Sequence, residues 1–246
     1  MKMCATKYSK AEATGELIRR GLHLCGALNG WPETAMEQLA TGSRLQHFTK
    51  GSVVMHAGSD RRDALVVVSG SVEIGGVDSD GARFVLTMRG AGEIIGIARM
   101  LRDRKFVYTY RASEDAVLVF LPANVLETVL DAHPPLWRTL CMLMLDRMCD
   151  QIELSKRWAF SLPSFRVADT LLRLCAQHGM HSTHDGHLHL RISQTDLAAM
   201  LAVSRQTVNK ELRLLEQKGA LDSGYGELRI LDINKLREIC DAPRYL

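Results

Sequence analysis

Aromatic residues, prolines and closely spaced cysteines are all scarce in this 246-residue sequence. Its six cysteines form no C-x-x-C pair, which argues against a zinc site and against a redox dithiol. Scattered cysteines of this kind are typical of a reducing cytoplasm. The first residues lack the apolar core of a signal peptide, and the richest apolar run, 136–145, is too short to span a bilayer. We therefore expect a cytoplasmic protein that has no membrane partner.

The sequence also lacks the motifs that most often carry catalysis. It has no recognisable nucleophile motif, no paired carboxylates and no loop of the kind that cradles a phosphate. The segment HGMHSTHDGHLHL is rich in histidine but lacks the ligand spacing of a known zinc site. Its histidines are His178, His181, His184, His187 and His189. We expect a solvated loop, no metal and no enzyme; a metal-dependent enzyme that uses this loop is the alternative.

Composition and charge indicate a folded protein that is mildly basic. The hydrophobic fraction of 46% is ample for packed cores. The formal net charge of +3 is compatible with a polyanionic partner. Many enzymes share this balance, so charge alone does not assign a function.

Residues 44–121 have the pattern of an antiparallel β-barrel. Short runs rich in valine and isoleucine alternate with joints that contain glycine, most clearly in DALVVVSGSVEI and DAVLVFLP. Asp80-Gly81 lies between two such runs and predicts a tight hairpin. Short helices are expected before the barrel, over 12–40, and after it, over 123–131.

A long helix is expected over 135–160. Apolar residues cover nearly every side of its first half, so more than one surface must cover it. One face fits the barrel, and another remains for a second copy of the chain. The residues predicted along that dimerisation seam are Trp137, Leu140, Met144, Arg147, Gln151, Leu154 and Trp158, which follow 3-4 spacing. An ordinary core helix is the alternative.

The stretch SQTDLAAMLAVSRQTVNKELRLLE contains two helix start signals separated by one turn. Ser193 and Ser204 are each positioned to cap a helix, and small Ala198 and Ala202 permit the two helices to approach closely. This is the pattern of a helix-turn-helix, in which the second helix enters the major groove of DNA. A β-hairpin is expected after Gly219, where a wing would follow. A solvated helical hairpin is the alternative.

Polar side chains gather at the start of that second helix. Arginine donates bidentately to guanine, and glutamine pairs with adenine. Hydroxyl groups near a helix start bind phosphate together with the backbone amides there. The predicted DNA contacts are Ser193, Gln194, Ser204, Arg205, Gln206, Thr207, Asn209 and Lys210, with Arg213 on the same face. The sequence therefore predicts a DNA-binding protein.

The order of barrel, long helix and winged helix-turn-helix resembles the Crp/Fnr family of bacterial transcription regulators, named after the cyclic-AMP receptor protein and the fumarate–nitrate regulator. GSVVMHAG, ALVVVSGSVEI and GEIIG in the barrel carry this resemblance together with the helix-turn-helix stretch. It implies an α+β fold with a jelly roll like that of cyclic-nucleotide-binding domains. It also implies a homodimer that senses a signal in the barrel, binds a palindromic DNA site and contacts RNA polymerase. A ligand-binding regulatory module without DNA function is the alternative.

The resemblance also divides the chain and gives individual residues roles. It implies a sensor domain over 1–134, a dimerisation helix over 135–160 and a DNA-binding domain over 161–246. It marks Arg205, Gln206 and Lys210 as base contacts, and Ser193, Ser204 and Thr207 as phosphate contacts. The cyclic-AMP receptor has glutamate and arginine where this chain has Gln206 and Lys210, so we expect a different half-site. The sequence does not distinguish an activator from a repressor.

The effector pocket that the resemblance implies differs from that of the cyclic-AMP receptor. Ile97 replaces its ribose-binding glutamate, Phe106 and Val107 replace its phosphate-binding Arg-Ser pair, and Gln151 and Ile152 replace its adenine-binding hydroxyl residues. A buried phosphate without its arginine lacks the charged partner that offsets desolvation. Cyclic AMP is therefore not the expected signal. Four basic residues in the same segment still offer positive charge, namely Arg99, Arg102, Arg104 and Lys105.

No cofactor is identified from the sequence. An iron–sulfur sensor like that of the fumarate–nitrate regulator needs a tight N-terminal cysteine cluster, and Cys4 and Cys25 are too far apart to form one. Haem, nitric oxide, a small organic acid or the absence of any effector all remain compatible with the sequence.

Overall fold

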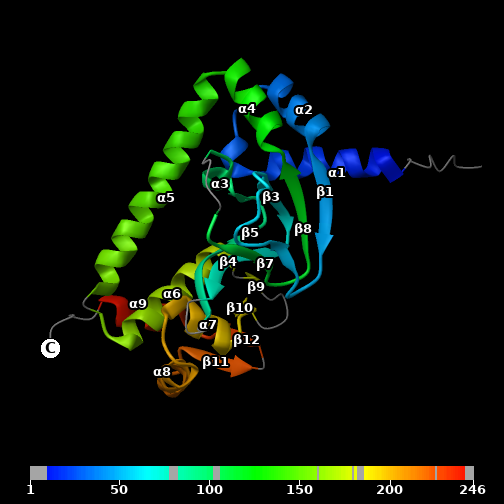
Figure 1. Cartoon of the computed structure of the whole chain (residues 1–246). Helices are drawn as coiled ribbons and strands as arrows, with labels where there is room; N and C mark the ends of the chain where they lie inside the picture. The colour runs from blue at the N-terminus through cyan, green and yellow to red at the C-terminus, as the bar shows by residue number, and fades with distance from the viewer. Residues whose placement is uncertain are drawn as a thin grey trace, which may run out of the picture. The chain divides into compact units, whose positions relative to one another are not determined.

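The structure is a computed structural model that describes residues 10–77, 83–101, 106–159, 161–178, 180–181, 186–224 and 226–241 (Figure 1). The chain divides into two compact units, one formed by 1–76 and 88–146 and the other by 77–87 and 147–246. The long helix α5, Pro135–Ala159, contributes to both units. Within the described ranges, no helix combines the length and the apolar character that crossing a membrane requires.

Two four-stranded sheets lie mainly in the first unit, although most of β5 belongs to the second. One has the strand order β1-β8-β3-β6 and the other β2-β7-β4-β5. The strand pairs β1–β8, β3–β8, β2–β7 and β4–β7 are all antiparallel. The strands are β1 Arg44–Phe48, β2 Val53–Met55, β3 Ala64–Ser69, β4 Ser71–Val77, β5 Arg83–Gly90, β6 Ile94–Ile95, β7 Thr109–Ala112 and β8 Ala116–Leu121.

Strand β3 has apolar side chains on both of its faces because each face packs against a different core. Successive side chains of a strand point to opposite sides of the sheet. Leu65 and Val67 belong to the core that includes residues of both sheets, such as Tyr110 on β7. Ala64 and Val66 belong to a second core, which the sheet shares with helices. All four side chains from Ala64 to Val67 are therefore buried, and this part of β3 lacks the alternation of a half-exposed strand.

Helices cover the outer face of the β1-β8-β3-β6 sheet through this second core. They are α1 Lys10–Leu24, the short 3-10 helix η1 Gly26–Leu28, α2 Glu33–Gly42, α4 Ala123–Ala132 and the first part of α5 (Figure 1). Gly42 allows α2 to lie close to α4, because a Cβ at this position would come within 2.6 Å of Val125 Cγ1. A short helix, α3 Ile97–Leu101, follows β6 and has no clear signal in the sequence pattern.

The second unit combines helices with a small sheet. Helix α6 contacts α7, α8 and α9, and the sheet has the strand order β11-β12-β10-β9. Asp232 Oδ1 accepts a hydrogen bond from Asn234 N at 2.9 Å and so caps the last helix. The elements are α6 Pro163–His178, β9 Met180–His181, β10 Leu188–Leu190, α7 Gln194–Leu201, α8 Arg205–Gln217, β11 Leu221–Gly224, β12 Glu227–Ile230 and α9 Ile233–Asp241.

The architecture agrees with the predicted α+β fold. The predicted helix over 135–160 ends at Ala159, and the hairpin predicted after Gly219 is formed by β11 and β12. The turn predicted at Asp80-Gly81 lies outside the described residues.

Candidate DNA interface and sensor site

Helix α7 begins with a reciprocal cap between Ser193 and Asp196. Ser193 Oγ accepts from Asp196 N at 3.0 Å and donates to Asp196 Oδ2 at 2.6 Å. Arg83 Nη1 lies 2.7 Å from Asp196 Oδ1. Burial alone would raise the pKa of Asp196, but the hydrogen bonds from Ser193 and Arg83 and the charge of Arg83 outweigh it and lower the pKa. Asp196 is therefore held as a carboxylate at the start of the first helix of the pair.

Helix α8 begins with a similar cap. Ser204 has extended backbone geometry, and its Oγ accepts from Thr207 N at 3.1 Å. The two hydroxyl oxygens of Ser204 and Thr207 also lie 2.9 Å apart, which is a hydrogen bond. Capping of this kind stabilises a helix start and leaves the N–H groups of the first turn pointing away from the helix. Both helix starts predicted from the sequence are therefore present.

A tight turn joins the two helices. Ala202 has φ of 51°, in the left-handed region, and is the one non-glycine residue with positive φ in the described part of the chain. Its N–H and that of Val203 both donate to the carbonyl of Ala198. The helices are held across this turn by buried Leu197, Ala198, Leu201, Val208, Leu212 and Leu215.

The outer face of α8 carries the side chains predicted to contact DNA. Arg205, Gln206, Lys210 and Arg213 are exposed, as is Ser204 before them. Asn209 is half-buried, and its Nδ2 donates to Gln194 Oε1 at 3.4 Å, so these two predicted contacts lie side by side. The structure therefore brings the predicted DNA contacts of both helices together on one small surface.

The β11–β12 hairpin is tied to α8 and across its own strands. Glu216 Oε1 accepts from Ser223 N at 3.0 Å, which fastens the hairpin to the end of α8. Arg229 Nη2 lies 2.7 Å from Asp222 Oδ2 on the neighbouring strand. The hairpin thus holds a fixed place beside α8, as a wing does.

A histidine of the histidine-rich segment contacts a carboxylate of the paired strand. His189 Nδ1 lies 3.1 Å from Glu227 Oε1 on the paired strand β12. The described ranges contain no group of three or more His, Cys, Asp or Glu side chains that could hold a metal ion. His184 lies outside those ranges, so the absence of a metal site stays a prediction.

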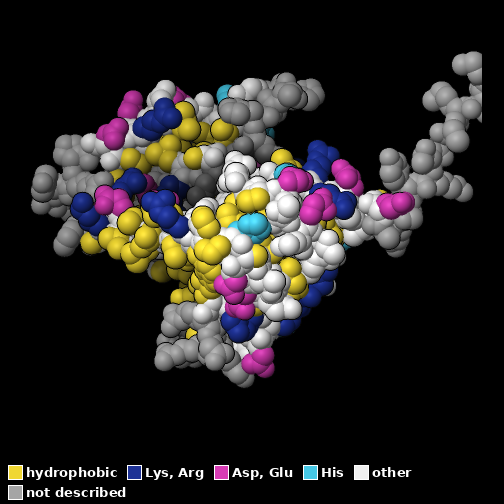
Figure 2. Space-filling view, turned by 90° about the horizontal axis from the view of Figure 1, so that it is seen from above, with side chains coloured by type: hydrophobic (Ala, Val, Ile, Leu, Met, Phe, Trp, Pro, Cys, Tyr) yellow, Lys and Arg dark blue, Asp and Glu magenta, His cyan; other side chains and the backbone are white. Residues whose placement is uncertain are grey.

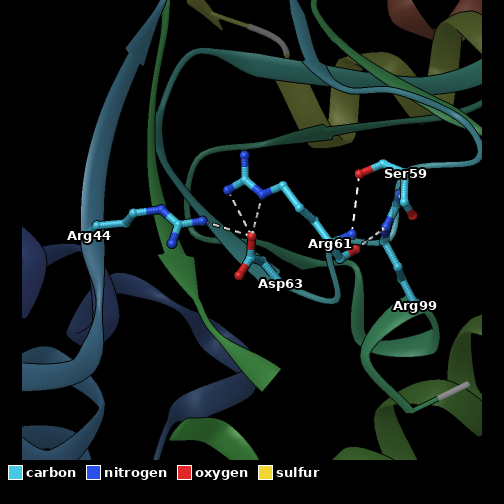
Figure 3. A network of polar contacts seen from close by, with 5 residues as sticks. All are labelled: Arg44, Ser59, Arg61, Asp63 and Arg99. Carbon is cyan, nitrogen blue, oxygen red and sulfur yellow. Dashed lines mark hydrogen bonds and ion pairs between the residues drawn. The ribbon is translucent and has the colours of Figure 1, made fainter. Parts of the chain in front are cut away.

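In the first unit, called the sensor unit below because it contains most of the predicted sensor domain, two arginines pair with Asp63 (Figure 3). Asp63 Oδ2 accepts from Arg44 Nη2 at 2.8 Å and from Arg61 Nε at 2.9 Å. Both guanidinium carbons lie 5.0 Å from the centre of the Phe120 ring, within cation–π range. One carboxylate therefore pairs with two cations at the edge of the core.

Arg99 extends into the same region from α3 but makes different contacts (Figure 3). It is 1% exposed, and its Nε donates to the Arg61 carbonyl at 2.7 Å while its Nη2 donates to the Ser59 carbonyl at 2.9 Å. Its guanidinium also lies over the Phe106 and Tyr110 rings, 5.7 and 5.8 Å from their centres. Burial lowers the pKa of Arg99, although Tyr110 opposes that shift. The positive charge of Arg99 is thus used to hold the 56–61 loop against the sheets.

The residues predicted at the effector pocket do not meet in one place within the sensor unit. Ile97 belongs to the core beneath the helices, whereas Phe106 packs against the core between the sheets. Val107 is 71% exposed. Gln151 and Ile152 are exposed on α5. Of the four basic residues in this segment, Arg99 is the one that the structure describes.

Several of the residues predicted at the dimerisation seam contact their own chain. Leu140 is 1% exposed in the core of the sensor unit, and Trp137 and Met144 pack against that core. Trp158 Nε1 donates to Asp169 Oδ2 at 3.2 Å, and Gln151 is exposed. Arg147 is half-buried, and Leu154 is buried. The predicted seam is therefore mainly the face of α5 that packs on its own chain.

Comparison with known proteins places both units in one family. Residues 45–133 match the model of the cyclic nucleotide-binding domain, and residues 165–239 match the model of the Crp-like helix-turn-helix domain. The chain is 30% identical over 200 residues to the HTH-type transcriptional regulator Cmr of Mycobacterium tuberculosis, which covers 81% of this chain and 77% of that protein. The chain belongs to the Crp/Fnr family of transcription regulators.

Further members of the Crp/Fnr family are similar to this chain over most of its length. The cAMP-activated global transcriptional regulator CRP of Haemophilus influenzae is 24% identical over 193 residues, covering 77% of this chain and 84% of that protein. The crystal structure of TTHA1359, a Crp/Fnr-family transcriptional regulator of Thermus thermophilus, gives a TM-score of 0.69 at 25% identity. The match covers 81% of this chain and 99% of that one. As a Crp/Fnr regulator, the chain is a DNA-binding transcription regulator with a cyclic-nucleotide-binding-like domain.

Sequence reasoning alone does not find the role of Arg99 in this Crp/Fnr regulator. Its partners, the carbonyls of His56, Ser59 and Arg61, are backbone groups about forty positions away. Every residue has a backbone carbonyl, so the sequence does not indicate which carbonyls accept from Arg99. The one available signal is the position of Arg99 in the apolar run IIGIARML, where an arginine must be paired or exposed.

Proposed function

We propose that the chain binds a palindromic DNA site as a homodimer, with the start of α8 in the major groove of each half-site. The observation that carries this proposal is the exposed group of Arg205, Gln206 and Lys210 on a helix whose opposite face is buried. A helix held by its apolar side presents such donors to base edges without further rearrangement.

Each polar group at the start of α8 has a chemical role in this proposal. Arg205 donates bidentately to a guanine, and Gln206 pairs with an adenine. The hydroxyl groups of Ser204 and Thr207 share one hydrogen between them. One hydroxyl hydrogen therefore remains for a phosphate oxygen, and Ser193 and Gln194 at the start of α7 lie beside the same strand of DNA.

The proposed dimer face is the side of α5 that its own chain leaves exposed. Cys141, Leu145, Met148 and Ile152 recur at intervals of four, three and four residues, and all four are exposed. Ile152 is 59% exposed, which is unusual for a large apolar side chain. This spacing matches the a and d positions of a two-stranded coiled coil. Hydrophobic side chains also reach the surface over a broad area of the face shown in Figure 2.

We further propose that the sensor domain responds to a signal other than cyclic AMP and that the bound dimer contacts RNA polymerase. The side chains at the nucleotide-binding positions support the first part, because Ile97 and Phe106 are apolar and pack in different cores. The contact with RNA polymerase rests on the family resemblance. Isothermal titration with cyclic AMP tests the signal: we expect no binding at micromolar concentration, and micromolar affinity would overturn this part.

A selection of bound duplexes from a random-sequence pool tests the main proposal. We expect an enriched palindrome, a complex with two chains by light scattering, and an affinity that falls steeply with salt as neutralised phosphates release counterions. Recovery of no sequence motif would overturn the proposal and favour a regulatory module without DNA function. Enrichment of an asymmetric site bound by one chain would overturn the dimeric arrangement.

A further inference from the structure

The junction between α5 and α6 is held by a buried carboxylate. Helix α5 ends at Ala159 and α6 begins at Pro163. The carboxylate of Asp169, on the second turn of α6, is 2% exposed. Its Oδ1 accepts from Arg157 Nη2, and its Oδ2 accepts from Trp158 Nε1 at 3.2 Å. Two consecutive residues at the end of α5 therefore bind one side chain of the next helix.

A second set of contacts surrounds this carboxylate. The Arg157 guanidinium lies 5.6 Å from the centre of the Phe165 ring on α6. Arg166 donates from Nη2 to the Trp158 carbonyl at 3.0 Å and from Nε to Ser161 Oγ at 3.2 Å. We call Arg157, Trp158, Arg166 and Asp169 the α5–α6 clamp. Its donors come from both helices, so the clamp resists rotation in either direction.

The energetics of the clamp favour a single geometry. A buried carboxylate that loses one of its donors is left without compensation for its desolvation, which is far more costly than loss of an exposed pair. An exposed pair on the same helix, Glu153 with Lys156, is more than half exposed on both sides and contributes little. If the end of α5 moved away from α6, the buried carboxylate of Asp169 would lose its hydrogen-bond donors, so this movement is strongly disfavoured.

Helix α6 connects the clamp to the recognition helix. It packs on α8 and α9, and its buried Leu171 and Leu174 belong to the interior of this unit. Asp169 and Thr170 on the same helix are also buried. The clamp therefore links the last turns of α5 to α8 through α6.

We propose that Asp169 is a positioning residue that sets the spacing between DNA half-sites which the regulator accepts. This inference rests on the proposed function, since two copies joined along α5 present two copies of α8. Half-site centres one turn apart lie about 34 Å apart on one face of the duplex. One added base pair moves them by about 3.4 Å and rotates them by about 35°. With the clamp intact, the two α8 helices cannot shift and rotate to match the altered half-sites. With the clamp broken, they can.

The test compares operator spacing in the wild-type protein and in Asp169→Asn. The probe is the palindromic duplex enriched from the random pool, remade with its centre lengthened or shortened by one base pair, with affinity read by fluorescence anisotropy. For the wild type we expect a loss of roughly tenfold or more at either altered spacing. For Asp169→Asn we expect that loss to shrink severalfold, while affinity for an isolated half-site stays unchanged.

Two further variants keep the test decisive. Trp158→Phe removes one donor and keeps an aromatic ring, and it serves if Asp169→Asn fails to fold. We expect it, too, to lose less affinity at the altered spacings than the wild type does. Glu153→Gln, in the exposed pair on α5, is the matched control and should retain the wild-type profile. A spacing profile in both clamp variants that equals the wild type overturns the role of Asp169, as does an equal loss on isolated half-sites. A wild-type protein that binds no palindrome overturns the proposed function instead.

Discussion

The start of α8 and the interior of the sensor unit both depend on arginine, but they use it in opposite ways. Arg205 is exposed, and within the described residues no hydrogen bond engages its guanidinium. Arg99 is buried, and its Nε and Nη2 donate to backbone carbonyls of its own chain. Arg205 is therefore accessible to the proposed DNA partner, whereas Arg99 stabilises the fold of its own chain.

This difference separates residues proposed to bind DNA from residues that stabilise the fold. A substitution of Arg205, which makes no cap, should change DNA affinity and leave folding nearly untouched. A substitution in the sensor interior should change folding first. Substitutions in the two units can test that separation.

Replacing Arg99 by alanine should lower the free energy of unfolding by about 3 kcal/mol, because it leaves a cavity and unpaired carbonyls. Arg99→Met keeps most of the buried volume and should recover about half of that loss. Urea unfolding followed by circular dichroism measures both. Arg138→Ala, at an exposed position on α5, is the control and should stay within about 0.5 kcal/mol of the wild type. Wild-type stability of Arg99→Ala would mean that the arginine does not hold the 56–61 loop.

Replacing Arg205 by alanine should weaken specific DNA binding by roughly 1–3 kcal/mol, because a bidentate contact to a base is lost. Its free energy of unfolding should change by no more than about 0.5 kcal/mol. A gel-shift titration on the selected palindrome gives the affinity. Arg237→Ala, on the exposed side of α9, is the matched control and should bind as the wild type does. An unchanged affinity for Arg205→Ala would remove this residue from the interface.

Replacing Ser204 by alanine should cost about 1 kcal/mol of stability, because the cap that accepts from Thr207 N is lost. The measurement is thermal unfolding of the variant beside Ser155→Ala. Ser155 Oγ donates to the Gln151 carbonyl within α5 and caps no helix start, so its loss should be near neutral. Equal stability of the two variants would show that the Ser204 cap does not contribute.

Replacing Ala202 by glycine should raise stability by less than about 1 kcal/mol. Glycine removes the strain of a left-handed backbone but adds freedom to the unfolded chain, and the two terms nearly cancel. Ala199→Gly, in the regular part of α7, has only the second term and should lose about 1 kcal/mol. Urea unfolding of the pair should therefore show opposite signs, and a loss of similar size at both positions would contradict the left-handed turn.

The sequence predicts the helix-turn-helix well because its signals are local. Ser193 and Ser204 stand three residues before the backbone amides that they cap, so residue type and spacing alone identify them. The strands are predicted by composition for the same reason. Arg99 is different, since its bonds reach across the fold to backbone atoms. No local pattern records such a contact.

The two faces of α5 show a second limit. Apolar residues surround its first half, so periodicity predicts burial on several sides without stating which partner covers which side. The structure packs Leu140 and Met144 on the sensor unit and leaves Leu145 exposed. Only the packing of other elements separates the two faces.

The pairing of β1 with β8 has a consequence for the order in which the chain folds. Arg44 pairs with Phe120 and Phe48 with Ala116. The first strand of the sensor unit can therefore form its backbone hydrogen bonds only after the last strand is in place. In the other unit, α7 packs on α8 next to it, and β11 pairs with β12 across a short turn. Contacts between distant positions close slowly, and contacts between neighbours close fast. Refolding from denaturant should therefore complete the DNA-reading end of the chain before the end that senses.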